Sequence, residues 1–433
     1  MGKPRVACFR TIRHPETGEA LDKAVVIFFE AARSETAEDL AELQVHGGRA
    51  VIKAVLEALA LMPGCRPAEA GEFARRAFEN GKLDLVEVEG LADLVDAETE
   101  GQRRQALAQA GGALSKLYEG WRGQLIEISA LAEAALDFSD EADVSDKAFT
   151  QAREQAMPLM SAIRHHLDDK HRGEILRDGF RVALLGAPNA GKSSLLNALA
   201  KREAAIVSEE AGTTRDVIEV RLDLGGLPVI VSDTAGIRLS EGAIESEGIK
   251  RSLATARAAD LVLWLSEPGA SDEAIPVDIS RETFLRVATK MDLTSPSPLG
   301  ERVGVRGDRL FDAVAAPRPN PLPMPSAAAW GEGEVPISTK TGAGMEALIS
   351  AITDAARDRI GAHDEPALTQ VRHRHLLESC ALSLDAFLSG DATHTELRAE
   401  DLRLAAHALG RITGRVDVED ILDQVFSRFC IGK

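Results

Sequence analysis

The chain has 433 residues, with 50 Lys and Arg against 69 Asp and Glu, which gives a formal net charge of -19. That length exceeds one typical domain, and the negative charge disfavours indiscriminate nucleic-acid binding, because phosphate contacts need clustered cations. No run of 18 or more apolar residues occurs and the N-terminus lacks a signal-like segment, so we expect a cytoplasmic protein without a membrane span. The four cysteines are widely spaced, which indicates neither a disulfide framework nor a CxxC metal site.

The first part of the chain predicts two kinds of structure. Residues 1–80 mix strand-like segments with a helix-like stretch and predict a small α/β domain. In residues 81–177, apolar residues recur at helical spacing, as at Leu125, Ile128 and Ala132. This spacing predicts long helices.

The rest of the chain predicts an insertion. Residues 178–361 contain strand-like runs, whereas residues 362–433 return to helical spacing. We therefore expect 178–361 to be a separate domain, inserted into a helical domain whose two parts pack together. Residues 295–330 hold seven of the 18 prolines and have no periodicity, which predicts a flexible insertion. A nucleic-acid partner would need a local basic patch, and the basic pair Arg372 and Arg374 is one candidate, although such a pair is more often a solvated face than a binding site.

A phosphate-binding loop is predicted at the sequence Gly186-Ala-Pro-Asn-Ala-Gly-Lys-Ser193, which lies between an apolar run and a helix-like stretch. Glycines at 186 and 191 let the backbone curl until its N–H groups point at phosphate oxygens. Lys192 can reach the β- and γ-phosphates, and the Ser193 hydroxyl can bind Mg²⁺. The alternative, a chance glycine-rich turn, is disfavoured by the strand before the loop and by two further motifs.

These two motifs also follow strand-like runs. Asp233 would hold Mg²⁺ through water, and Gly236 can face the γ-phosphate. Asp292 would accept hydrogen bonds from the N1 and N2 positions of guanine, which selects GTP over ATP. Lys290 would cover the ring.

The guanine loop departs from the usual pattern, because Thr289 stands where Asn is usual. Its side chain is shorter and has no amide, so we expect weaker nucleotide binding. The sequence Ser338-Thr339-Lys340 resembles the last guanine-contacting loop. Together the motifs predict an α/β P-loop GTPase domain inserted in an all-α helical domain, preceded by a small α/β N-terminal domain.

A switch segment is predicted at residues 209–216, where Thr213 or Thr214 could place a hydroxyl on Mg²⁺. The alternative is an ordinary polar turn. Ile237 stands where Ras-like enzymes have a water-orienting Gln, so another group must orient the water. Glu245 is a candidate, and a solvated loop charge is its alternative.

Three stretches carry a resemblance to a known family: Asn189-Ala-Gly-Lys-Ser-Ser194, Gly212-Thr-Thr-Arg-Asp216 and the terminal Phe429-Cys-Ile-Gly-Lys433. With a GTPase domain set within helices, the chain resembles the tRNA-modification GTPase MnmE family, also called TrmE, over nearly its whole length. The chain starts partway into the family's N-terminal domain and has no counterpart of a folate-binding arginine. We therefore expect an incomplete folate-binding and dimerisation domain.

The resemblance implies a defined activity. Members of the family work on tRNA with an FAD-dependent subunit, MnmG, and install an aminomethyl or carboxymethylaminomethyl group at C5 of the wobble uridine. The carbon comes from a tetrahydrofolate derivative. Members are homodimers, and their GTPase domains meet during hydrolysis with a bound K⁺ that stands in for an arginine finger.

The resemblance also implies site residues. Ser193 and Thr214 match Mg²⁺ ligands. The catalytic residues are Glu245, at the position of the water-orienting carboxylate, and Lys192. The K⁺ site is formed by Asn189, Ser208, Glu210 and Thr213. Other expected nucleotide contacts are Ala190, Gly191, Ser194, Gly212, Asp233, Gly236, Lys290, Asp292, Ser338 and Thr339. The folate contacts are Glu42, Lys82 and Lys433, and Cys430 is a candidate functional thiol.

Two other functions stay open from the sequence. The chain could be a GTP-switched assembly factor, which needs no folate, redox partner or terminal thiol. No basic RNA-binding domain follows the GTPase segment, which counts against that function. It could also be a nucleotide-binding scaffold that has lost its activity.

Overall fold

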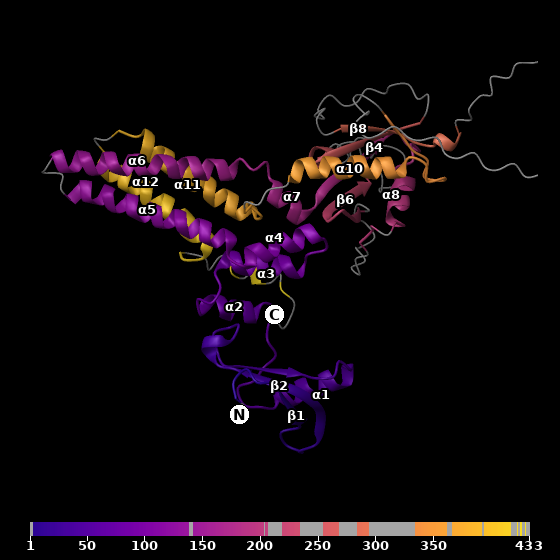
Figure 1. Ribbon diagram of the computed structural model, residues 1–433, viewed down its shortest axis with the longest axis horizontal. Coiled ribbons are helices and arrows are strands. Elements are labelled where there is room, and N and C mark those ends of the chain that lie inside the picture. Colours follow the sequence, from indigo (N-terminus) through magenta and orange to yellow (C-terminus); the bar gives the residue numbers. More distant parts are fainter. Residues whose placement is uncertain are drawn as a thin grey trace, which may run out of the picture. The chain divides into compact units, whose positions relative to one another are not determined.

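The computed structural model of the chain (Figure 1) describes residues 3–137, 142–202, 204–206, 219–233, 254–267, 284–293, 334–361, 366–391 and 394–416, together with Leu422, Val425, Phe426 and Phe429. The chain divides into two compact units. One unit comprises Met1–Ala97, Gln102–Arg177 and Asp364–Lys433, and the other comprises Glu98–Gly101 and Asp178–His363. The second unit is therefore inserted into the sequence of the first.

The first unit begins with a three-stranded antiparallel sheet in the order β1-β2-β3. Its strands are β1 (Cys8–Arg13), β2 (Ala20–Phe29) and β3 (Leu40–Gln44). Helix α1 (Arg49–Ala60) packs against β2, and α2 (Glu72–Glu79) follows. This is the small α/β domain that the sequence predicts.

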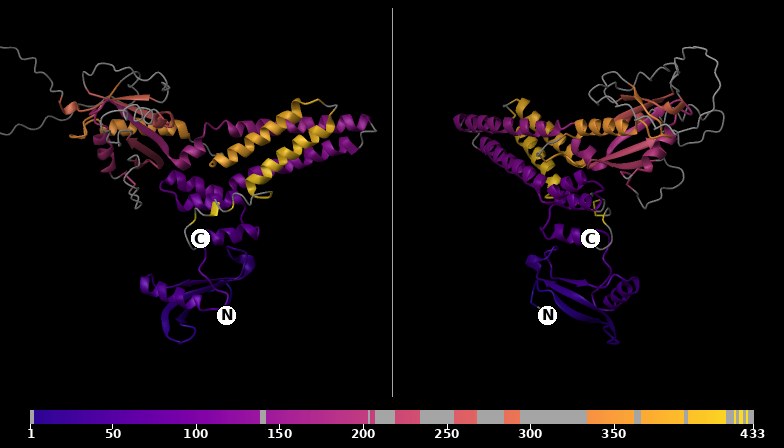
Figure 2. Two further views of the ribbon diagram at one scale, coloured as in Figure 1. Left: turned by 180° about the vertical axis from the view of Figure 1, so that it is seen from behind. Right: turned by 45° about the vertical axis from the view of Figure 1, so that its right-hand side comes forward.

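The rest of the first unit is helical. Its helices are α3 (Leu85–Val95), α4 (Glu100–Ala110), α5 (Ala113–Asp137), α6 (Ala142–Leu167), α7 (Arg172–Asp178), α11 (Val371–Ser389) and α12 (Thr395–Thr413). Figure 2 shows the long helices α5, α6, α11 and α12 side by side. None of the described helices combines the length and apolar character needed to cross a membrane.

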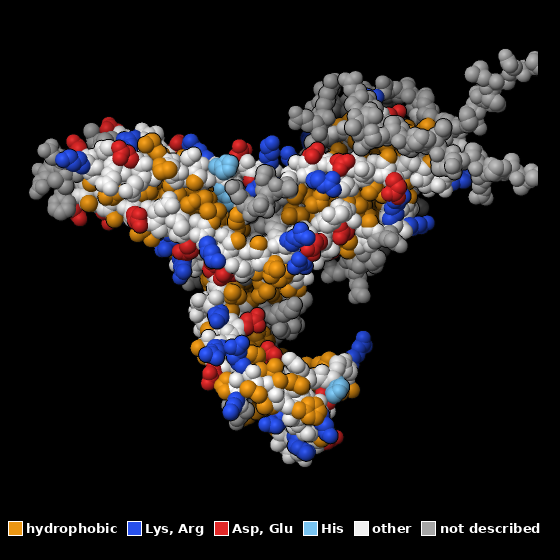
Figure 3. Space-filling model, viewed as in Figure 1, with side chains coloured by type: hydrophobic (Ala, Val, Ile, Leu, Met, Phe, Trp, Pro, Cys, Tyr) orange, Lys and Arg blue, Asp and Glu red, His pale blue; other side chains and the backbone are white. Residues whose placement is uncertain are grey.

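These four long helices share one core. The predicted apolar positions Leu125, Ile128 and Ala132 on α5 are buried in the same cluster as Leu402 and Leu409 on α12. Helices from before and after the inserted unit thus bury their apolar stripes against one another, as helical spacing predicts. On the face shown in Figure 3, charged side chains of both signs are interspersed.

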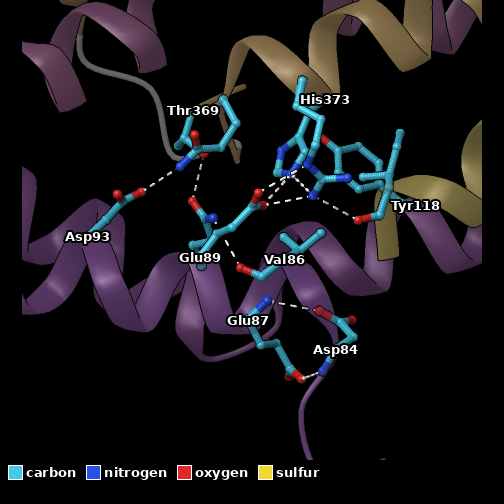
Figure 4. A network of polar contacts seen from close by, with 12 residues as sticks. Asp84, Val86, Glu87, Glu89, Asp93, Tyr118, Thr369 and His373 are labelled. Carbon is cyan, nitrogen blue, oxygen red and sulfur yellow. Dashed lines mark hydrogen bonds and ion pairs between the residues drawn. The ribbon is translucent and has the colours of Figure 1, made fainter. Parts of the chain in front are cut away.

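Helix α3 carries a buried ion cluster (Figure 4). The Glu89 side chain is only 4% exposed and accepts hydrogen bonds from Arg372 at 2.9 Å and from His373 at 2.7 Å. Arg374 is also buried and pairs with Asp169 and Glu174. The interpretation of Arg372 and Arg374 as a solvated face is therefore wrong, because both guanidiniums pair with carboxylates far away in the sequence.

The charge state of this cluster follows from its surroundings. Burial opposes ionisation of Glu89, but the hydrogen bonds from His373 and Arg372 and the positive charge of Arg372 outweigh it and hold the pKa of Glu89 well below its usual range. Burial also lowers the pKa of His373, which favours a neutral ring that donates its Nε2–H to the carboxylate. Glu89 and Arg372 therefore form the charged pair.

The second unit contains a six-stranded sheet in the order β5-β6-β4-β7-β8-β9, parallel except for β5. Its strands are β4 (Phe180–Gly186), β5 (Glu219–Leu224), β6 (Leu227–Asp233), β7 (Leu261–Ser266), β8 (Phe284–Ala288) and β9 (Val335–Pro336). Helices α8 (Lys192–Ala200) and α10 (Met345–Ile360) pack against it. The central strand β4 is almost continuously apolar and buried, as expected for a parallel strand covered on both faces. The predicted fold class is confirmed.

We expect Glu89→Gln to lower the free energy of unfolding by about 3 kcal/mol, because it removes the charge that pairs with a poorly solvated guanidinium. Denaturant unfolding would measure the change. The folded-state pKa lies below the usual 4.5, so the stabilisation is complete above that pH and is lost as the pH falls toward about 2.

The matched control is Glu133→Gln, because Glu133 pairs with Arg403 at 3.2 Å but both side chains are more than half exposed. This change should leave the stability nearly unchanged. Equal effects of the two substitutions would contradict the prediction.

Candidate functional site

The phosphate loop connects the end of β4 to the start of α8 in the second unit. Gly186 has a φ of +142°, and a Cβ at this position would lie 2.2 Å from the Leu265 carbonyl oxygen. Asn189 and Gly191 also have positive φ values, of 67° and 97°. Position 186 therefore requires glycine, both for its backbone conformation and for the close approach of β7.

Lys192 lies inside the curl of this loop. Its side-chain ammonium donates to the carbonyl oxygens of Gly186 at 2.6 Å and Ala187 at 2.9 Å. Burial lowers the pKa of Lys192, and the nearby Asp233 carboxylate partly offsets this effect. The loop thus holds a cation at the place where the sequence predicts phosphate contacts.

The two described residues that are predicted to serve Mg²⁺ are brought together. The Ser193 hydroxyl donates to the Asp233 carboxylate at 2.8 Å, and Asp233 is buried at the end of β6. One hydroxyl and one carboxylate provide the oxygen atoms that Mg²⁺ prefers, and this ion usually completes its shell with water and phosphate. No cluster of three or more His, Cys, Asp or Glu suited to a metal occurs among the described residues.

The two predicted guanine loops are joined by hydrogen bonds. The buried Ser338 donates its hydroxyl to Asp292 at 2.8 Å, and the Met291 N–H donates to the Ile337 carbonyl at 3.2 Å. Lys290 has a φ of +55° and pairs with Glu267. The structure therefore places Asp292, Lys290 and Ser338 in neighbouring loops at the carboxyl ends of β8 and β9, where ligands bind in open α/β sheets.

Thr289 has a role that sequence reasoning missed. It is 2% exposed, and its hydroxyl lies 2.7 Å from the Ala190 carbonyl oxygen of the phosphate loop and 3.1 Å from that of Ser266 at the end of β7. A threonine hydroxyl is therefore long enough to join the guanine loop to the phosphate loop. Only the spatial approach of these two loops reveals this contact.

Several predicted residues lie outside the described part of the chain. They are Ser208, Glu210, Gly212, Thr213, Thr214, Gly236, Glu245, Cys430 and Lys433, and the whole of the predicted 295–330 insertion lies outside it as well. Of the folate residues, Glu42 lies on β3 and Lys82 follows α2, and both are exposed. Within the described residues, no hydrogen bond or ion pair joins these two side chains.

The sheet order, the glycine-rich loop around Lys192, the Ser193–Asp233 pair and the guanine loop at Asp292 define a P-loop GTPase unit. The sequence around it is equally informative. Residues 1–82 match the model of the GTP-binding protein TrmE N-terminus, and residues 85–430 match that of the MnmE helical domain.

Full-length relatives agree with these matches. The tRNA modification GTPase MnmE of Parvibaculum lavamentivorans is 51% identical over 435 residues, covering 100% of this chain and 91% of the relative. That of Rhodospirillum rubrum is 52% identical and covers 96% of this chain and 86% of the relative. That of Azorhizobium caulinodans is 48% identical, with 99% and 90% covered. The chain belongs to the tRNA modification GTPase MnmE family.

We expect Thr289→Val to weaken GTP and GDP binding about fivefold, because the loss of one hydrogen bond costs about 1 kcal/mol. Thr289→Ser keeps the hydroxyl and is the matched control, so its affinity should stay near that of the unmodified chain. Titration with a fluorescent nucleotide would measure both.

Wild-type affinity in Thr289→Val would show that the hydroxyl has no part in binding. Tighter binding by Thr289→Asn would instead support the sequence-based expectation that threonine weakens the loop.

Proposed function

We propose that this chain hydrolyses GTP in the modification of C5 of the tRNA wobble uridine, together with the FAD-dependent subunit MnmG. The observation that carries the proposal is the Lys192, Ser193 and Asp233 arrangement in a chain about half identical to proteins named tRNA modification GTPases. The protein would act in the cytoplasm as a homodimer through its N-terminal domain.

The described residues have separate tasks in this proposal. Lys192 exchanges its loop carbonyl partners for phosphate oxygens, so its positive charge meets the charge that develops during phosphoryl transfer. Ser193 and Thr214 would bind Mg²⁺, and Asp233, which accepts a hydrogen bond from Ser193, would hold it through water. When bound, this ion neutralises charge on the β- and γ-phosphate oxygens. Asp292 selects the guanine base and Lys290 covers its ring, with the Ser338 hydroxyl donating to the Asp292 carboxylate.

The proposed K⁺ site begins at Asn189. This residue is exposed, has a left-handed backbone and makes no side-chain hydrogen bond among the described residues, so its amide oxygen can reach a cation. Ser208, Glu210 and Thr213 would complete the site, and Glu245 would orient the attacking water. Their positions come from the family resemblance.

The proposed folate site consists of Glu42, Lys82 and Lys433. The carboxylate suits the N–H groups of a pterin, whereas the two ammonium groups suit anionic parts of the cofactor. Glu42 and Lys82 are both exposed, which leaves their charged groups accessible to a ligand.

We expect GTP turnover to be faster in KCl than in NaCl at equal ionic strength, because the proposed cation site replaces an arginine finger. Steady-state phosphate release by the purified chain would measure it. GTP binding in the two salts is the control, since the cation is expected to act mainly in the transition state. Equal turnover in both salts would rule out a K⁺-dependent mechanism.

We also expect the chain, mixed with MnmG, tRNA, GTP and a tetrahydrofolate carbon donor, to convert the wobble uridine to its 5-substituted form. Mass spectrometry of digested tRNA would detect the product. Glu245→Ala should bind GTP but lose both turnover and modification, as expected for a group needed only in the transition state.

An assembly factor would turn over GTP without forming modified uridine under these conditions. Turnover without modification, with an active MnmG verified separately, would therefore favour that alternative.

A further inference from the structure

The two chain segments on either side of the long insertion, residues 178–363, meet inside the first unit. Helix α7 is the last element before the insertion, and residues 366–370 are the described part of the return to α11. Gly173 of α7 lies so close to the returning chain that a Cβ at this position would be 2.1 Å from the Leu368 carbonyl oxygen. Leu368 is fully buried. The outgoing and returning segments are therefore packed backbone against backbone.

One carboxylate on α3 binds both connections. Asp93 accepts a hydrogen bond from Arg177 of α7 at 2.9 Å and one from Gln370 of the returning segment at 3.0 Å. The Asp93 side chain is 9% exposed and that of Arg177 is 19% exposed. Solvent and salt screen such a pair much less than a surface pair.

The neighbouring hydrogen bonds reinforce this connection. Thr369 of the returning segment donates to Gln109 at 2.7 Å, and Gln109 in turn donates to the Val86 carbonyl at the start of α3. Gln105 of α4 donates to the Gly173 carbonyl of α7 at 3.0 Å. Figure 4 shows Thr369, Glu89 and Asp93 gathered along α3.

Another face of α3 contacts the C-terminal segment, of which the structure describes Leu422, Val425, Phe426 and Phe429. Leu85, Val88 and Ala92 share one apolar cluster with the buried aromatic residues Phe426 and Phe429. Asp93 and Ala92 lie on the same helix. Any shift of the helix therefore changes both the Asp93 hydrogen bonds and the apolar contacts with the C-terminal segment.

The start of α3 is equally well fixed. Asp84 caps the helix and forms a capping box with Glu87. Lys82, one of the proposed folate residues, precedes the cap by two positions. The helix is about 16 Å long, so it can act as a rigid rod between the Asp93 contacts and Lys82.

We propose that α3 transmits the nucleotide state of the inserted unit to Lys82 and the C-terminal segment, with Asp93 as the positioning residue that holds both connections to the helix. This inference rests on the proposed function. A change in the GTPase unit that pulls on α7 or on the returning segment acts on α3 through Asp93. The helix then shifts the groups at its other contacts.

Hydrogen–deuterium exchange of the full chain tests the proposal. Residues 85–95 should change their protection when a non-hydrolysable GTP analogue replaces GDP. In Asp93→Asn this nucleotide-dependent change should disappear, because Arg177 and Gln370 donate to different carboxylate oxygens and the NH2 group that replaces one of them cannot accept a hydrogen bond. Wobble-uridine modification should fall about tenfold, the size of a typical coupling between sites. Intrinsic GTP turnover should change less than about twofold, because the GTPase loops are retained.

Two further variants make the test specific. Gln370→Ala removes only the hydrogen bond from the returning segment to Asp93 and should reduce the same exchange response, which provides a milder change if Asp93→Asn proves unstable. Asp385→Asn is the matched control, because it breaks an exposed Arg164 pair of 2.8 Å within the same unit. Its exchange response and modification should match those of the unmodified chain.

Identical protection of residues 85–95 in both nucleotide states would overturn the proposal, as would an unchanged response in Asp93→Asn and Gln370→Ala. The exchange measurement requires only that the chain binds the nucleotide, not that it hydrolyses GTP. Absence of GTP hydrolysis would therefore count against the proposed function while the exchange result still decides the role of α3.

Discussion

The buried ion cluster on α3 is the constraint on which the first unit depends. Removing a carboxylate or a guanidinium from water costs several kcal/mol, and only complete pairing offsets that cost. Glu89 meets this condition by accepting from both Arg372 and His373, while Arg372 also donates to the Arg411 and Ile412 carbonyls at the end of α12. Hydrogen bonds are directional, whereas apolar burial is not. The cluster therefore sets the orientation of α3 relative to α11 and α12, which apolar packing alone does not do.

The second unit depends on a different constraint, because its loops must be held in order around a nucleotide. Parallel strands bring their carboxyl ends to one edge of the sheet, where the loops after β4, β6, β8 and β9 collect. Hydrogen bonds from Ser193 to Asp233, from Thr289 to Ala190 and from Ser338 to Asp292 then connect these loops in pairs. Loops that are already joined lose less conformational entropy when they bind a ligand.

Local patterns in the sequence predict much of this structure. The phosphate loop is recognisable because its chemistry requires glycine and lysine at fixed spacing, and the helical stripes are recognisable because burial repeats with the helical period. The polar contacts between distant segments could not be predicted in this way. His373 and Glu89 are separated by 284 positions, and Thr289 and Ala190 by 99. No short-range pattern identifies such partners, which explains why Arg372 and Arg374 resembled a solvated face.

The division of the chain into two units gives these contacts a functional meaning. The described GTPase residues belong to the second unit, whereas Glu42 and Lys82 belong to the first. If both serve one reaction, the state of the GTPase unit has to influence the first unit, and the chain segments that join the two provide one route. The segments before and after residues 178–363 are both held to α3, because Arg177 and Gln370 donate to Asp93. A closely packed helix resists bending, so a displacement at Asp93 is carried to its start beside Lys82 rather than absorbed along the way.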